Sequence, residues 1–299
     1  MKRESLIMIT FIALAAMACS LFAPVPAEQP QPGVATIVAA TLQSMPTNPL
    51  PSAEPPTRIP PTAPAGTPLT YQNVSFVIPA GLASGADGEV VPEATEANSD
   101  PWSVGPAYIR FTLKGYSISI NDSLKPEVRI YPAQELAAAN SWADGSLKRL
   151  QAVLASPAAA LSNDNLPTVP YLGAAAQQYA AQAKLVPFKN GNGVRMLSQY
   201  AQFPGPIIKN NSFYHYEGLT QDGKYFVTVL LPVILPIKSS TENPSADGIT
   251  YPSDLSDTTA LNAYFSGMTS LLDSAKPETF QPTIPLMDAL VQSITVIAK

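Results

Sequence analysis

Residues 212–233 read SFYHYEGLTQDGKYFVTVLLPV, and the fold is decided in this stretch. Two extended runs flank residues 220–223, where Asp222-Gly223 offers the backbone angles that a tight hairpin turn needs. The second run is almost wholly apolar, which is typical of a central strand buried on both faces. We therefore expect residues 212–219 and 224–233 to pair antiparallel.

The first run of this hairpin alternates in character. Tyr214 and Tyr216 share one face of the strand, and His215 and Glu217 share the other. We expect the tyrosine face to lie in the core and the opposite face to be wetter, the alternative being a tyrosine face exposed for recognition. His215, the only histidine, is expected to be a half-buried strand residue rather than a catalytic base, because no Gly-x-Ser-x-Gly motif accompanies it.

A second hairpin is predicted just upstream. Residues 181–202 read AQAKLVPFKNGNGVRMLSQYAQ, and the turn is expected at Asn190–Gly193. Alternation predicts three further strands, at residues 71–79, 107–114 and 126–132. The aromatic residues that crowd the two hairpins are Tyr200, Phe213, Tyr214, Tyr216, Tyr225 and Phe226.

Three segments have helical patterns. Residues 133–155 are Ala-rich with a leucine stripe, and Gly145 is the candidate break. Residues 252–275 form a second helix, for which Asp254 or Ser256 is the candidate cap. Residues 285–298 begin as a helix and end as a short strand. The leucines of the stripe are Leu147, Leu150 and Leu154.

Strands joined by hairpins predict an antiparallel sheet with helices packed on one or both faces, so the fold class is α+β. The tail LMDALVQSITVI, residues 286–297, resembles the end of PsbP/Mog1-like domains, in which a last helix delivers a short Ser-aromatic-x-Val segment. Ile294 stands here in place of the aromatic residue. Such a likeness implies a fold and no function.

The N-terminus begins with Lys2 and Arg3 and continues with an apolar run, Leu6–Ala18, which is too short to span a bilayer. Ala16-Met17-Ala18-Cys19 then resembles the lipobox of bacterial lipoproteins. The resemblance implies that residues 1–18 are a signal peptide and that Cys19, the only cysteine, is the lipid attachment site. It also implies an exported protein anchored on the extracytoplasmic face of a membrane. The alternatives are an ordinary secretory signal or a buried core helix.

Residues 19–68 are predicted to be a proline-rich linker, because 13 of the 32 prolines lie in residues 24–68. Residues 33–45 interrupt the linker with apolar residues at helical spacing. They predict either a transient helix or an amphipathic helix that lies on a membrane or a partner. Residues 69–299 are expected to form a single α+β domain.

The charge balance is acidic. Without Lys2, Arg3 and Glu4, the chain keeps 15 basic and 21 acidic residues, a net charge of −6, which argues against nucleic acid as a partner. Residues 85–102 form an acidic stretch that lacks EF-hand spacing, so a solvated loop is expected and calcium binding is the alternative. Its acids are Asp87, Glu89, Glu93, Glu96 and Asp100.

No motif points to a catalytic residue, a metal site or a cofactor, and the ligand-binding residues are not identified. The interpretation that these patterns favour is a lipid-anchored cell-surface module that binds a protein or small-molecule partner without catalysis. One alternative is the solute-binding component of an uptake system, although such proteins usually alternate strands and helices. The other is a hydrolase that works with paired carboxylates.

Overall fold

A computed structural model describes residues 66–298, except 119–123, 158 and 169–174. The predicted signal peptide, Cys19, the linker and the segment 33–45 lie outside the described residues. The described residues form one compact unit, and the two antiparallel sheets and four α-helices found among them confirm the α+β class. Within the described part of the chain, no helix is both long and apolar enough to cross a membrane.

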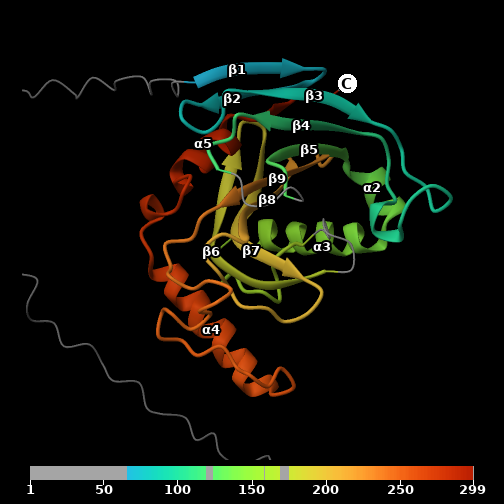
Figure 1. The fold of residues 1–299 in the computed structure, drawn as a ribbon. Helices are drawn as coiled ribbons and strands as arrows, with labels where there is room; N and C mark the ends of the chain where they lie inside the picture. The colour runs from blue at the N-terminus through green and yellow to red at the C-terminus, as the bar shows by residue number, and fades with distance from the viewer. Residues whose placement is uncertain (1–65, 119–123, 158, 169–174, 299) are drawn as a thin grey trace, which may run out of the picture. The chain divides into compact units, whose positions relative to one another are not determined.

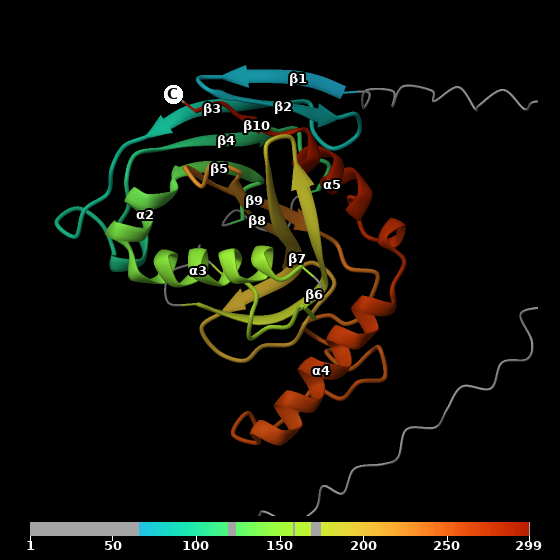
Figure 2. The ribbon, with the colours of Figure 1, turned by 180° about the vertical axis from the view of Figure 1, so that it is seen from behind.

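A seven-stranded sheet, with strand order β3-β4-β5-β9-β8-β7-β6, forms the centre of the unit (Figure 1). Every neighbouring pair is antiparallel. Both views show the sheet curling around helix α3, with β3–β5 on one side of the helix and the ends of β6 and β7 on the other (Figures 1 and 2). The strands are β3 (Gly85–Val91), β4 (Tyr108–Lys114), β5 (Glu127–Pro132), β6 (Ala176–Phe188), β7 (Gly191–Ala201), β8 (Ser212–Thr220) and β9 (Tyr225–Val233).

The hairpin β8–β9 forms as predicted, and β9 is a central strand between β5 and β8. Tyr214 and Tyr216 are fully buried in the main core, so the prediction that they are core residues is confirmed. The expected wetter face is wrong, because His215 and Glu217 are fully buried as well. Ser146 of α3 contacts Glu217, so a helix covers the face that was expected to meet water.

The turn of the upstream hairpin differs from the prediction. Residues 189–190 make the turn, whereas Gly191 and Gly193 belong to β7. A Cβ atom on Gly191 would collide with the ring of Phe188, and one on Gly193 would collide with the ring of Tyr216. These glycines are therefore needed because aromatic rings pack directly against the strand backbone, and not because a turn requires their backbone dihedral angles.

The convex face of the large sheet is covered by a small sheet and two helices. The small sheet consists of β1 (Gly66–Tyr71), β2 (Val74–Pro79) and β10 (Thr295–Val296), in the order β1-β2-β10. The strand predicted at 71–79 is β2, but it begins only at Val74, because Tyr71 ends β1 and the chain turns at Gln72, where φ is 54°. The helices are α4 (Thr258–Ser274) and α5 (Ile284–Ser293).

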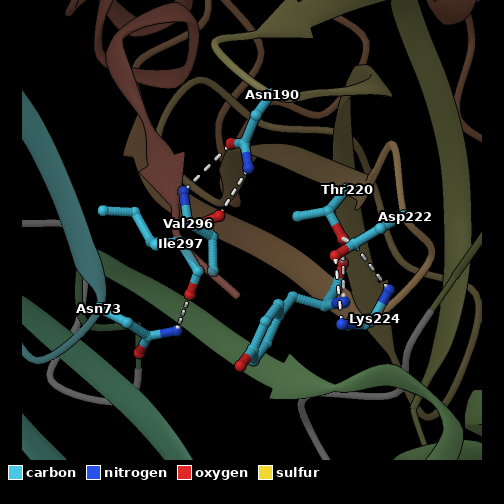
Figure 3. A network of polar contacts seen from close by, with 8 residues as sticks. Asn73, Asn190, Thr220, Asp222, Lys224, Val296 and Ile297 are labelled. Carbon is cyan, nitrogen blue, oxygen red and sulfur yellow. Dashed lines mark hydrogen bonds and ion pairs between the residues drawn. The ribbon is translucent and has the colours of Figure 1, made fainter. Parts of the chain in front are cut away.

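Asparagine side chains fasten β10 in place (Figure 3). Asn190 accepts a hydrogen bond from Val296 N at 3.1 Å and donates one to Val296 O at 2.5 Å. Asn73 donates a hydrogen bond to Ile297 O at 2.7 Å. β10 pairs with β2 along one edge and has no described strand along its other edge in the small sheet. Asn190 bonds to this other edge as a neighbouring strand would.

Two helix boundaries differ from the predictions. The helix expected at 133–155 is divided into α2 (Ala133–Ala139) and α3 (Ser141–Ala155) at Asn140, and Gly145 lies inside α3. The Asn140 side chain caps α3 by accepting hydrogen bonds from the backbone amides of Trp142 and Ala143, which favours the start of a new helix. Asp257 caps α4, because Asp254 is engaged with Ser256 in the preceding turn.

The acidic stretch is not a solvated loop along its whole length. Residues 85–91 form the edge strand β3, and two of its acids face cations on β4. Asp87 lies 2.6 Å from the Lys114 ammonium group, and Glu89 lies 2.8 Å from the Arg110 guanidinium group. The alternation of the strand and these cross-strand pairs account for Asp87 and Glu89 without a bound cation.

Candidate functional site

A cavity of about 660 Å³ opens beside α3, whose residues form part of its lining. We call it the aromatic pocket. Both tryptophans of the chain, Trp102 and Trp142, line it together with Tyr200. Trp142 is 51% exposed, which is unusual for so large an apolar side chain. The remaining described lining residues are Ser141, Gly145, Arg149, Thr168, Ala175, Ala176 and Gln177.

Asn140 brings the two tryptophans together. Its side-chain oxygen accepts hydrogen bonds from Trp142 N and Ala143 N, both at 3.1 Å, and so caps α3. Its side-chain nitrogen donates to Val104 O at 3.0 Å and lies 3.5 Å from Trp102 O. One buried amide thus joins the start of α3 to the turn at Pro101–Ser103 that carries Trp102.

The wall formed by α3 consists of residues one helical turn apart, namely Ser141, Gly145 and Arg149. Arg149 donates hydrogen bonds to Leu166 O and to the Thr168 hydroxyl group, both at 3.0 Å. These bonds hold residues 166–168 against the helix. The guanidinium group is the one charged side chain among the described lining residues.

Gly145 is costly for α3, since glycine in a helix interior is less stable than alanine by about 0.5–1 kcal/mol. Packing does not require it. A Cβ atom at this position would meet only Arg149 Nη1, at an ordinary 3.8 Å. The space beside Gly145 belongs to the aromatic pocket, so a large side chain at this position would extend into the cavity.

The floor of the pocket is the buried ring of Tyr200. This ring stacks on Phe213 with centroids 5.6 Å apart, and its hydroxyl group donates to the side chain of Gln177 at 3.3 Å. Burial raises the pKa of Tyr200 well above its usual value; the charge of Glu217 raises it further, and that of Arg149 opposes the rise. The hydroxyl group is therefore neutral at physiological pH and available for hydrogen bonding.

A buried polar network lies behind this floor. The imidazole of His215 is 6.1 Å from the Tyr200 ring, and its Nε2 lies 3.0 Å from a carboxylate oxygen of Glu217. The other carboxylate oxygen accepts a hydrogen bond from the Ser146 hydroxyl group at 2.9 Å. The carboxylate stands between the hydroxyl and the imidazole, whereas a hydrolytic triad needs the imidazole in the middle. All three side chains are fully buried, so the network fixes α3 to β8.

The structure places the candidate aromatic and acidic residues of the sequence analysis in different parts of the fold. Tyr200 lines the pocket and Phe213 stacks on it, whereas Tyr214 and Tyr216 belong to the main core on the opposite face of the sheet. Asp87 and Glu89 are paired with cations on β4, and no group of three potential metal ligands occurs among the described residues. Cys19 lies outside the described residues.

Of the described lining residues, sequence reasoning singled out only Tyr200 as a candidate; those it missed include Trp102, Trp142, Gly145 and Arg149. A signal was available for two of them. Trp142 lies off the leucine stripe of its helix, which places the largest apolar side chain outside the face expected to be buried. Gly145 is unfavourable in the same helix, and it was interpreted as a break. Trp142 and Gly145 together indicate a helix face that does not pack in the core and could line a binding site.

A larger cavity, about 950 Å³, lies between β6, α4 and residues 161–166. Two of its polar side chains, those of Gln182 and Arg195, are already engaged. Gln182 binds the C-terminal end of α4 through three carbonyl groups. Arg195, only 4% exposed, bonds to Gln182 O and lies 3.3 Å from Asp288. These contacts brace the bulged edge strand, and we favour the aromatic pocket as the functional site.

Comparison of the chain with known protein families, with curated proteins and with solved structures finds no match.

Proposed function

We propose that this chain is an exported, lipid-anchored binding protein that holds a small organic ligand in the aromatic pocket without changing it chemically. The lipobox-like residues 16–19 support the anchor. The observation that carries the binding role is the convergence of both tryptophans and Tyr200 on one cavity. Ligand sites are concave, largely apolar and supplied with a few fixed polar groups, which describes this pocket.

The glycine in the wall and the buried network behind the floor support the same role. Gly145 keeps the cavity open at a cost to its helix. Ser146, the next residue, ties the helix to Glu217 of β8, so the wall is held in position before any ligand arrives. A preorganised wall lowers the entropy cost of binding.

A thermal-shift screen of metabolite and glycan libraries tests the proposal. The detergent-solubilised full chain is compared with the Gly145→Leu variant, in which a side chain fills the pocket from a helix position that favours leucine. We expect hits that raise the Tm of the wild type and leave the Tm of the variant unchanged. A screen without hits, or with hits that shift both proteins equally, would contradict the proposed site.

A further inference from the structure

The lining of the aromatic pocket combines two kinds of surface. Trp102, Trp142 and Tyr200 offer apolar ring surface. Ser141, Thr168 and Gln177 offer hydroxyl and amide groups, which both donate and accept hydrogen bonds. A matching ligand has apolar faces and, around them, groups that both donate and accept.

Charge excludes one class of ligand. Arg149 is the only charged residue among the described lining residues, and it is a cation. A cage of tryptophan and tyrosine rings attracts organic cations when no positive charge stands nearby. Here the guanidinium group opposes such a ligand, and no carboxylate in the described lining offsets it.

Two other classes fit the lining poorly. Thr168 already accepts a hydrogen bond from Arg149, and Gln177 accepts one from Tyr200 and donates one to Asn163. A wholly apolar ligand would leave the remaining hydrogen-bonding capacity of these two side chains and of Ser141 unused, which costs free energy. An organic anion would find a single guanidinium group whose Nε and Nη2 already bond to Leu166 and Thr168.

We propose that the ligand of the aromatic pocket is a neutral saccharide, an inference that rests on the proposed binding function. A sugar ring has C–H faces that pack on indole and phenol rings. Its hydroxyl groups donate and accept, as the side chains of Ser141, Thr168, Gln177 and Tyr200 do. A neutral sugar also places no charge beside Arg149.

Intrinsic fluorescence tests this assignment, because the only two tryptophans of the chain both line the pocket. The full chain is solubilised in a detergent without a sugar headgroup. It is then titrated with trisaccharides of glucose, mannose, galactose and N-acetylglucosamine. The comparison probes are tetramethylammonium, cyclohexane and cyclohexanecarboxylate, which represent the cationic, apolar and anionic classes and do not fluoresce. We expect at least one saccharide to change the emission of the wild type in a saturable way and to leave Gly145→Leu unaffected.

Two further variants show which surfaces the sugar uses. Trp142→Ala removes an exposed ring, and Thr168→Val removes a hydroxyl group while keeping the shape of the side chain. Each is expected to weaken saccharide binding tenfold or more, whereas Phe203→Ala, at an exposed aromatic residue outside the pocket, leaves it unchanged. If only a comparison probe binds, and Gly145→Leu abolishes its binding, the saccharide assignment is wrong and the binding function stands. If no probe of any class binds, both proposals fail.

Discussion

At the scale of single residues, the account depends on side chains that connect separate segments. Asn140 caps α3 with its oxygen and holds the turn of Trp102 with its nitrogen. Glu217 joins the hydroxyl group of Ser146 to the imidazole of His215. Each residue is buried, so the polar groups it satisfies have no water to replace it.

Replacement of Glu217 by alanine is expected to lower the free energy of unfolding by about 3–5 kcal/mol, because it leaves buried polar partners behind. Urea denaturation measures the change. The control is Asp144→Ala, which removes an exposed carboxylate 2.7 Å from Lys148 on the same helix and should cost less than about 1 kcal/mol. Equal losses in the two variants would show that the buried network contributes nothing beyond a surface pair.

At the scale of elements, local chemistry explains which parts of the fold were predictable. The hairpin at residues 212–233 could be predicted from its own sequence, since both the turn residues and the apolar pattern lie within it. The need for glycine at positions 191 and 193 of the strand comes instead from the rings of Phe188 and Tyr216. These rings reach the two glycines only when the chain folds.

The break at Asn140 and the pocket escaped prediction for a related reason. Asn140 is favoured as a cap partly because carbonyl groups of residues 101–104 lie beside it in the fold. The walls of the pocket come from the Trp102 turn, α3, the segment before residue 169 and the strands β6 and β7. No single stretch of sequence shows that these segments meet.

The fastening of β10 gives a prediction at this scale (Figure 3). Asn190→Ala leaves both backbone groups of the buried residue Val296 without their asparagine partner, at an expected cost of about 1–3 kcal/mol. Hydrogen exchange at Val296 should accelerate along with the loss of stability.

Asn73→Ala is the matched control for Asn190→Ala. Asn73 makes one side-chain bond to Ile297, which is 64% exposed, so water replaces the lost partner. If the two alanine variants lose the same stability, Asn190 does not act as a strand edge.

At the scale of the whole unit, helices or the small sheet cover each face of the large sheet, and tyrosines are buried on both sides. Burial raises the pKa values of Tyr179, Tyr200, Tyr214 and Tyr216. A group whose pKa is raised by folding contributes stability that is complete below its unfolded pKa and is lost as the pH rises toward the folded value.

The contribution of these tyrosines to stability is therefore expected to be constant through neutral pH and to fall above about pH 10, where tyrosines of the unfolded chain ionise. Tyrosinate absorbance should rise in two steps, first for exposed residues and then for the buried ones as the protein unfolds. A single step near the ordinary tyrosine pKa in a still folded protein would contradict the burial of these four residues.

Membrane attachment is the prediction that concerns the N-terminus. Cys19→Ala should release the protein from membranes or block its maturation, because the thiol is the proposed lipid attachment site. Membrane fractionation measures this, with Cys19→Ser as a second variant that also lacks the thiol. Retention of both variants at wild-type levels would rule out the lipid anchor.

The central claim is that a ligand binds between the two tryptophans, and ¹⁹F NMR of the full chain labelled with 5-fluorotryptophan tests it most directly. The chain has two tryptophans, so the spectrum should contain two signals, which Trp102→Phe and Trp142→Phe assign. We predict that a ligand from the thermal-shift screen moves both signals in a saturable titration with one dissociation constant. A ligand that stabilises the protein and leaves both signals in place would bind elsewhere and would contradict the account.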